Sequence, residues 1–180
     1  MGLDMYIFKT SKDTKARTKL FDDIQKAVKA DEKASTRVGD FFVSMHWIGS
    51  NMENHVDKLN PAAYWRKANH IHEWFSVNVL GNQPGTNGRK FGRVSKEQLL
   101  ELRGMCTAVL TRCTNESNKI EIDEDFCRMM FPPTESVPYG GSTEYGEEFI
   151  EDMQATIEQI EKLLHTTNFQ KNKLFYYSYY

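Results

Sequence analysis

Apolar and polar residues alternate along the first positions of the chain. Leu3, Met5 and Ile7 fall on one side, and a carboxylate and two aromatic rings fall on the other. A period of two residues predicts a β-strand over residues 3–9 with two usable faces. Residues 173–180 (KLFYYSYY) are rich in aromatic residues and predict a second strand. We expect these two strands to pair with each other.

Several segments show apolar residues at spacings of three or four, which is typical of amphipathic helices. One follows an Asn-Pro pair that favours a helix start, and another follows Ser95 and Gln98, which form a capping-box pattern. A further long helix is expected to be capped by Ser142 or Thr143, with glutamates near its positive end. Two of the predicted helices cover residues 19–34 and residues 60–80. Two more are predicted, one that begins after its cap Ser95 and one that begins after its cap Ser142 or Thr143.

The remaining segments complete the expected fold. Residues 41–48 predict another strand, residues 81–93 (GNQPGTNGRKFGR) a glycine-rich basic loop, and residues 114–141 an irregular but ordered loop. We therefore expect an α+β fold with one domain over residues 1–180. A small antiparallel sheet, formed by the terminal segments and the 41–48 strand, would be covered by three or four helices.

The composition indicates a protein with a real core and without a membrane span. Apolar residues make up 39% of the 180 residues and aromatic residues 12%, enough for a core without disulfides or metals. No apolar run approaches the ~20 residues that a membrane span requires, so no membrane partner is expected. Cys106, Cys113 and Cys127 are sparse and lack Cys-x-x-Cys spacing, so we expect buried thiols in a reducing compartment.

Charge is unevenly distributed along the chain. Residues 1–103 hold 17 basic and 12 acidic side chains, whereas residues 104–180 hold 6 and 13. The basic half could gather phosphates or an acidic partner, or the two halves could fold together and cancel in part. A net charge of −2 disfavours general binding to duplex nucleic acid.

The predicted helix over residues 60–80 has a second, unusual face. Trp65, Asn69 and His72 have the spacing i, i+4 and i+7, and Arg66 lies in an adjacent row. Arginine can hold a phosphate with two hydrogen bonds and tryptophan can stack on a flat ring, so this face suits an anionic ligand that carries such a ring. The alternative is a helix packed on two sides, with its tryptophans in the core.

Two glycine-containing segments offer backbone N–H groups to an anion. The loop over residues 81–93 also carries basic side chains but lacks the P-loop pattern and the dinucleotide-binding fingerprint. Gly141 to Tyr145 precede a predicted helix, where exposed N–H groups can bind an anion. The alternatives are a surface loop for the first segment and a turn with a helix cap for the second.

No metal ion or cofactor is predicted. His70 and His72 are two residues apart, which is about 200° around a regular helix, so they cannot share one ion. A histidine general base would also need an orienting partner, and the sequence does not identify one.

Three blocks of residues resemble those of a known protein family. They are MGLDMY at residues 1–6, YWRKAN with IH and WF over residues 64–75, and GSTEY at residues 141–145. Together they resemble a family of small proteins encoded by bacteriophages and prophages. The resemblance implies a phage accessory protein in the cytoplasm of the infected bacterial host, and it brings no established reaction.

We expect the three blocks to converge on one ligand pocket. It would take a small phosphorylated or nucleotide-like molecule, and the protein would sequester a nucleotide-derived host signal as a counter-defence factor. The candidate ligand-binding residues are Asp4, Tyr6, Trp65, Arg66, Asn69, His72, Gly141, Ser142, Thr143, Glu144 and Tyr145.

Two alternatives belong to other functional classes. The first is a nucleotide-acting hydrolase or transferase, with His72 as base and Arg66 on a phosphate. The second is a protein inhibitor that blocks a host defence enzyme through the acidic half of the chain. The aromatic strand over residues 173–180 could also pair across a homo-oligomer.

Overall fold

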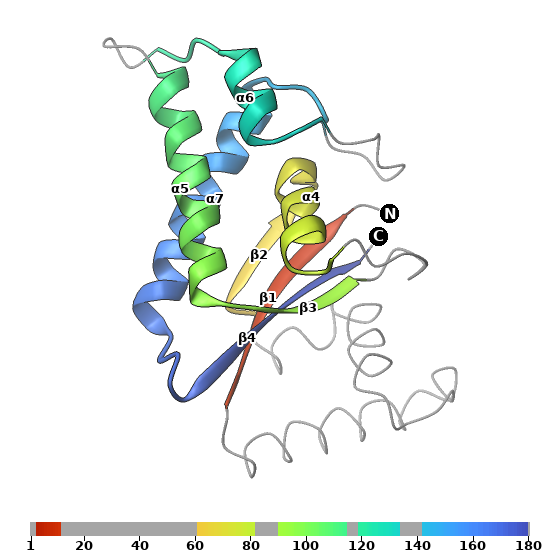
Figure 1. Cartoon of the computed structure of the whole chain (residues 1–180), viewed down its shortest axis with the longest axis vertical. Coiled ribbons are helices and arrows are strands. Elements are labelled where there is room, and N and C mark those ends of the chain that lie inside the picture. Colours follow the sequence, from red (N-terminus) through yellow and green to blue (C-terminus); the bar gives the residue numbers. More distant parts are fainter. Residues whose placement is uncertain (1–2, 12–60, 82–89, 115–118, 134–141, 180) are drawn as a thin grey trace.

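The computed structural model describes residues 3–11, 61–81, 90–114, 119–133 and 142–179 (Figure 1). These residues form four helices and a four-stranded antiparallel sheet, which confirms the predicted α+β class. In chain order the elements are β1 (Asp4–Ser11), β2 (Ala63–Arg66), α4 (Asn69–Asn78), β3 (Lys90–Val94), α5 (Lys96–Cys113), α6 (Glu124–Met130), α7 (Glu147–Thr166) and β4 (Asn172–Tyr179).

The sheet has the strand order β2-β1-β4-β3. β1 and β4 pair antiparallel along their whole length, from Asp4 opposite Tyr179 to Ser11 opposite Asn172, which confirms the expected pairing of the two terminal strands. Since β4 is flanked by β1 on one side and β3 on the other, its edges are occupied. Pairing of this strand across a homo-oligomer would require β3 or β1 to leave it.

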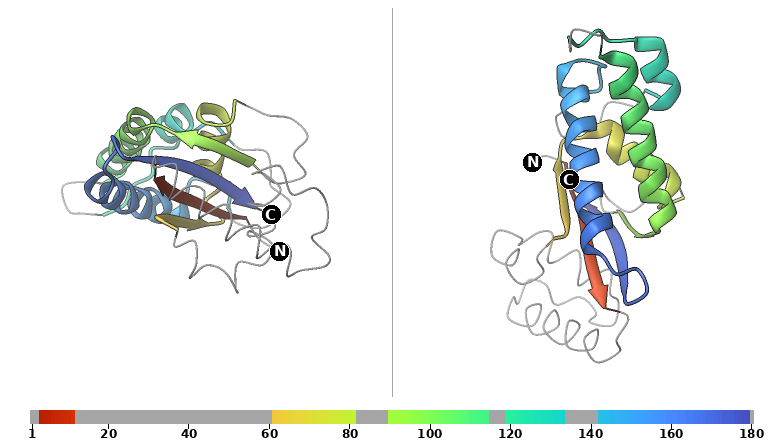
Figure 2. Two further views of the ribbon diagram at one scale, coloured as in Figure 1. Left: turned by 90° about the horizontal axis from the view of Figure 1, so that it is seen from below. Right: turned by 90° about the vertical axis from the view of Figure 1, so that its left-hand side faces the viewer.

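The helices cover one face of the sheet. Met5 and Ile7 of β1 are fully buried on that face, where they neighbour Trp65 of β2 and Tyr176 of β4 in the strand register. α4 and α7 pack there, and Figure 2 shows α7 alongside α5. The opposite surface of the sheet is called the outer face.

Residues 61–68 are not helical, so the predicted helix over residues 60–80 was wrong in its first third. Ala63–Arg66 form β2 and pair with β1, and the helix begins only at Asn69. Backbone hydrogen bonds extend this pairing, because the N–H of Lys67 donates to the carbonyl of Leu3 at 2.8 Å. A left-handed φ of 60° at Lys67 then separates the strand from the helix.

Of the other two helices predicted within the described residues, one begins where expected and one does not. The capping box of Ser95 and Gln98 is present with both of its hydrogen bonds, so this start is confirmed. α7 begins at Glu147 after Gly146, and the expected caps Ser142 and Thr143 lie several residues before it. The segment over residues 114–141, expected to be irregular, contains α6. The predicted helix over residues 19–34 and strand over residues 41–48 lie outside the described residues.

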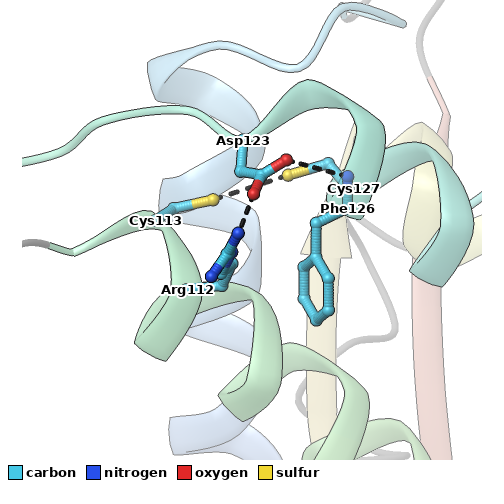
Figure 3. A network of polar contacts seen from close by, with 5 residues as sticks. All are labelled: Arg112, Cys113, Asp123, Phe126 and Cys127. Atoms are coloured by element: carbon cyan, nitrogen blue, oxygen red, sulfur yellow. Dashed lines mark hydrogen bonds and ion pairs between the residues drawn. The ribbon is translucent and has the colours of Figure 1, made fainter.

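A compact polar network fastens α6 to the end of α5 (Figure 3). Arg112 Nε donates to Asp123 Oδ2 at 2.7 Å, and the backbone N–H of Phe126 donates to Asp123 Oδ1 at 3.1 Å. The Sγ atoms of Cys113 and Cys127 lie 3.6 Å apart beside this pair. All three cysteines are buried free thiols, as the sequence predicted.

None of the helices in the described part of the chain combines the length and the apolar character that crossing a bilayer requires.

Candidate functional site

The outer face of β1 and β2 carries a cluster of polar and aromatic side chains. Asp4 is opposite Arg66 and Tyr6 is opposite Tyr64 in the antiparallel register, so all four side chains project from the same face. We call these four residues the outer-face cluster. β2 is an edge strand of the sheet among the described residues, which leaves its far side free of strand pairing.

Asp4 holds the polar part of the outer-face cluster together. The phenol of Tyr64 donates a hydrogen bond to Asp4 Oδ1 at 2.6 Å, and Arg66 Nε lies 3.9 Å from the same oxygen. The Arg66 side chain is 63% exposed and that of Asp4 is 26% exposed. An ion pair this long and this exposed contributes little to stability, so the guanidinium can turn to a ligand at small cost.

The aromatic part of the outer-face cluster is one end of a longer row of rings. The ring centroids of Tyr6 and Tyr64 are 5.0 Å apart, and those of Tyr6 and Tyr177 are 6.4 Å apart. Phe8, two residues further along β1, stacks on Tyr6 with ring centroids 5.9 Å apart. Tyr177 and Phe8 are buried, whereas Tyr64 is 42% exposed. A ligand would therefore reach this row at Tyr64.

The two phenols of the outer-face cluster keep their protons at neutral pH. Burial and the hydrogen bond to Asp4 raise the pKa of Tyr64 to about 12. Burial, followed by the charge of Asp4, also raises the pKa of Tyr6. Both groups are therefore hydrogen-bond donors rather than negative charges facing a ligand.

Three other candidate residues lie on the helix-covered side and act within the core. Trp65 Nε1 donates to Thr156 Oγ1 of α7 at 2.9 Å. Asn69 Nδ2 donates to the carbonyl of Ser142 at 3.0 Å. His72 Nδ1 shares a hydrogen bond with the phenol of Tyr176 at 2.7 Å. Each of the three candidates is at most 4% exposed.

The segment before α7 meets the start of α4 but not the outer-face cluster. The contact between Asn69 and Ser142 joins these two segments. Tyr145 is buried beyond them, and its phenol donates to the carbonyl of Phe131 at 2.6 Å. The N–H of Glu144 donates to Ser142 Oγ at 3.0 Å, which is a local turn. Thr143 is half-buried in the same turn, and Gly141 lies outside the described residues.

The candidates thus fall on two sides of the sheet rather than around one cavity. In β2, Trp65 points toward the helices and Arg66 toward the outer face, because neighbouring residues of a strand alternate. A single ligand cannot contact both groups. The expected convergence of all three blocks on one pocket is therefore not what the geometry shows.

Tyr64 belongs to the outer-face cluster but was not among the candidate ligand-binding residues. The structure places it in β2 rather than in the helix predicted over residues 60–80. Buried and exposed residues alternate over Ala63–Arg66, but the residue types Ala-Tyr-Trp-Arg do not alternate between apolar and polar. No local period-two signal therefore marks this strand, and the partnership of Tyr64 with Arg66 follows only from the pairing of the segment with β1.

The described residues hold no group of three or more histidine, cysteine or acidic side chains suited to a metal ion. The thiols of Cys106 and Cys127 are also unsuited to nucleophilic attack, because burial raises the pKa of Cys106, and burial with the neighbouring Cys113 thiol raises that of Cys127 to about 12.

Comparison with known proteins adds no assignment to these residues. No protein-family model, curated protein sequence or solved structure matches this chain. The chemistry of the outer-face cluster itself must therefore indicate its ligand: one exposed guanidinium, one carboxylate and two neutral phenols around an accessible aromatic ring.

Proposed function

We propose that the protein binds a small phosphorylated, nucleotide-derived molecule at the outer-face cluster. The observation that carries this proposal is the placement of Tyr64 and Arg66 two residues apart on the same face of an edge strand. Two residues of a strand span about 7 Å, which is comparable to the separation of base and 5′-phosphate in a nucleotide. The ring and the cation are thus spaced for the two ends of such a molecule.

Each residue has a distinct part in this binding mode. The base stacks on Tyr64, which is the accessible ring of the row. The guanidinium of Arg66 turns from Asp4 to the phosphate, where it can donate two parallel hydrogen bonds. Asp4 repels phosphate and accepts hydrogen bonds only, so it favours the amino or ring N–H groups of a base.

Capture of the ligand is favoured over its chemical conversion. The enzymatic alternative required His72 as base beside a phosphate on Arg66. His72 is 4% exposed and faces Tyr176 on the helix-covered side of the sheet, whereas Arg66 projects from the outer face. In the context of a phage accessory protein, binding without conversion would sequester a host signal in the cytoplasm of the infected cell.

Equilibrium dialysis of the purified protein tests this function. The ligand panel contains nucleoside mono-, di- and triphosphates and cyclic mono- and dinucleotides. We expect at least one class to bind and to be recovered intact after heat release. Failure to bind any class would overturn the proposal, and recovery of a converted product would replace capture by catalysis.

A matched pair of variants localises the binding. Arg66→Gln removes the cation of the outer-face cluster, while Arg103→Gln removes a cation from α5. We expect only Arg66→Gln to weaken binding. Equal affinities of the two variants would show that any observed binding occurs elsewhere. The protein-inhibitor alternative predicts instead that charge reversal at Glu147, Glu148, Glu151 and Asp152 of α7 abolishes capture of a host enzyme. It also predicts that Arg66→Gln leaves this capture unchanged.

A further inference from the structure

A cavity of about 240 Å³ lies between α4, α5 and the end of α6. These three helices stand on the helix-covered side of the molecule (Figure 1). Its walls are mainly apolar and come from all three helices and the segment that follows α6. They include Trp74 and Val77 of α4, Met105 of α5, and Met130 with Phe131 at the end of α6.

Two carboxylates also line this cavity. Glu73 comes from α4 and Glu101 from α5. The ion pairs of the described residues involve neither of them. The amide of Asn78 also lines the α4 side, and its Nδ2 donates to the carbonyl of Trp74 at 2.9 Å. Among the described residues that line it, the cavity therefore presents negative charge without a compensating cation.

His70 completes the lining and does not supply that cation. It is 3% exposed, and its ring lies 4.9 Å from the ring of Tyr145 and 4.8 Å from that of Phe149. Burial lowers the pKa of His70 to about 4, so the imidazole is neutral at pH 7. Its Nε2 is buried and has no hydrogen-bond partner among the residues described.

Charge and size together select one class of occupant. Two carboxylates beside a neutral imidazole repel phosphates and attract an ammonium group. The aromatic walls, Trp74 and Phe131, favour an apolar body and can contact a cation through their π faces. Pockets for drug-sized ligands measure roughly 300–1,000 Å³, so this one suits a smaller molecule.

We infer that this cavity is a binding site for a small organic cation, an amine with an aromatic or aliphatic body. The apolar part would lie among Trp74, Met105 and Phe131, and the ammonium group would face Glu73 and Glu101. This site is independent of the outer-face cluster, because it is on the other side of the sheet and selects the opposite ligand charge.

Ligand-observed NMR with three probes of one shape tests the inference. The probes are phenethylammonium, 2-phenylethanol and 3-phenylpropionate, which carry a cation, a neutral group and an anion on similar bodies. We expect phenethylammonium to bind several-fold more tightly than the alcohol, and the anion to bind most weakly. Equal binding of cation and anion, or no binding of phenethylammonium at millimolar concentration, would overturn the inference.

Two variants distinguish this cavity from general attraction to an acidic surface. Glu101→Gln and Glu161→Gln each remove one exposed helical carboxylate, but only Glu101 lines the cavity. We expect Glu101→Gln to reduce the preference for the cation over the alcohol by about twofold to fivefold, and Glu161→Gln to leave it unchanged. Equal effects of the two variants would contradict the site. Binding of nucleotides at the outer-face cluster is measured separately, so either proposal can fail alone.

Discussion

Phe75 and Tyr176 stack face to face, with ring centroids 4.1 Å apart and ring planes within 9° of each other. Both rings are fully buried, and they join α4 to β4, the strand that pairs with both β1 and β3. The phenol of Tyr176 also forms a hydrogen bond with His72 Nδ1. The stack of Phe75 on Tyr176 fixes α4 on the sheet. It thereby positions one wall of the cavity that lies between α4, α5 and α6.

Truncation of this stack is expected to destabilise the whole fold. Phe75→Ala removes a buried ring and leaves a cavity against Tyr176, which typically costs about 3–5 kcal/mol in the free energy of unfolding. Val77→Ala, on the exposed side of the same helix, is the control and should change it by less than about 0.5 kcal/mol. Urea denaturation measures both values, and similar losses in the two variants would contradict the assigned core.

The parts of the fold that were predictable from sequence depend on local signals. The capping box at Ser95 and Gln98 specifies a helix start within four residues, and the aromatic pattern of β4 specifies a strand. The segment Ala63–Arg66 was not predictable in the same way. Its local signals favoured a helix, but pairing with β1, some sixty residues earlier, satisfies its backbone as a strand.

The candidate site shows the same contrast between what local sequence signals and what only folding brings together. Asp4, Tyr6 and Arg66 were identified from residue type, and the structure does bring these three together. Trp65 and Asn69 were grouped with Arg66 because a helix would align them, whereas a strand and a turn separate them. The cavity proposed to bind a cation could not be found from sequence, because its two carboxylates come from α4 and α5 and become neighbours only after folding.

The hydrogen bond between Trp65 and Thr156 predicts a specific stability difference. Thr156→Val keeps the shape of the side chain but leaves the buried indole N–H without an acceptor, which we expect to cost about 1–3 kcal/mol. Thr156→Ser retains the hydroxyl and should cost less. Chemical denaturation of both variants provides the comparison. A valine variant as stable as the wild type would show that this hydrogen bond does not stabilise the contact of β2 with α7.

The outer-face cluster predicts a clear order of affinities at position 64. Tyr64→Phe keeps the ring and should retain most of the affinity for the tightest nucleotide of the dialysis panel. Tyr64→Leu removes the stacking surface and should weaken binding by about 1–3 kcal/mol, which is roughly fivefold to 150-fold. Isothermal titration calorimetry measures the two constants. Equal losses in both variants would indicate that the phenol, and not the ring, contacts the ligand.

Asp152 on α7 predicts a dependence of stability on pH. Burial, with the charges of Glu148 and Glu151, raises the pKa of Asp152 to about 7, compared with about 3.9 in an unfolded chain. The folded state therefore binds the proton more tightly than the unfolded state does. The contribution of this group to stability is fully present below about pH 4 and is lost as pH rises toward and through about 7.

Asp152→Asn should remove this dependence, because the amide has nearly the same shape and does not titrate. We expect the variant to be more stable than the wild type at pH 8, by roughly 1–2 kcal/mol, and the difference to shrink as pH falls to 4. Thermal unfolding at several pH values measures these differences. An Asp152→Asn variant that is destabilised equally at pH 4 and pH 8 would show that the carboxylate is held by contacts rather than penalised by burial.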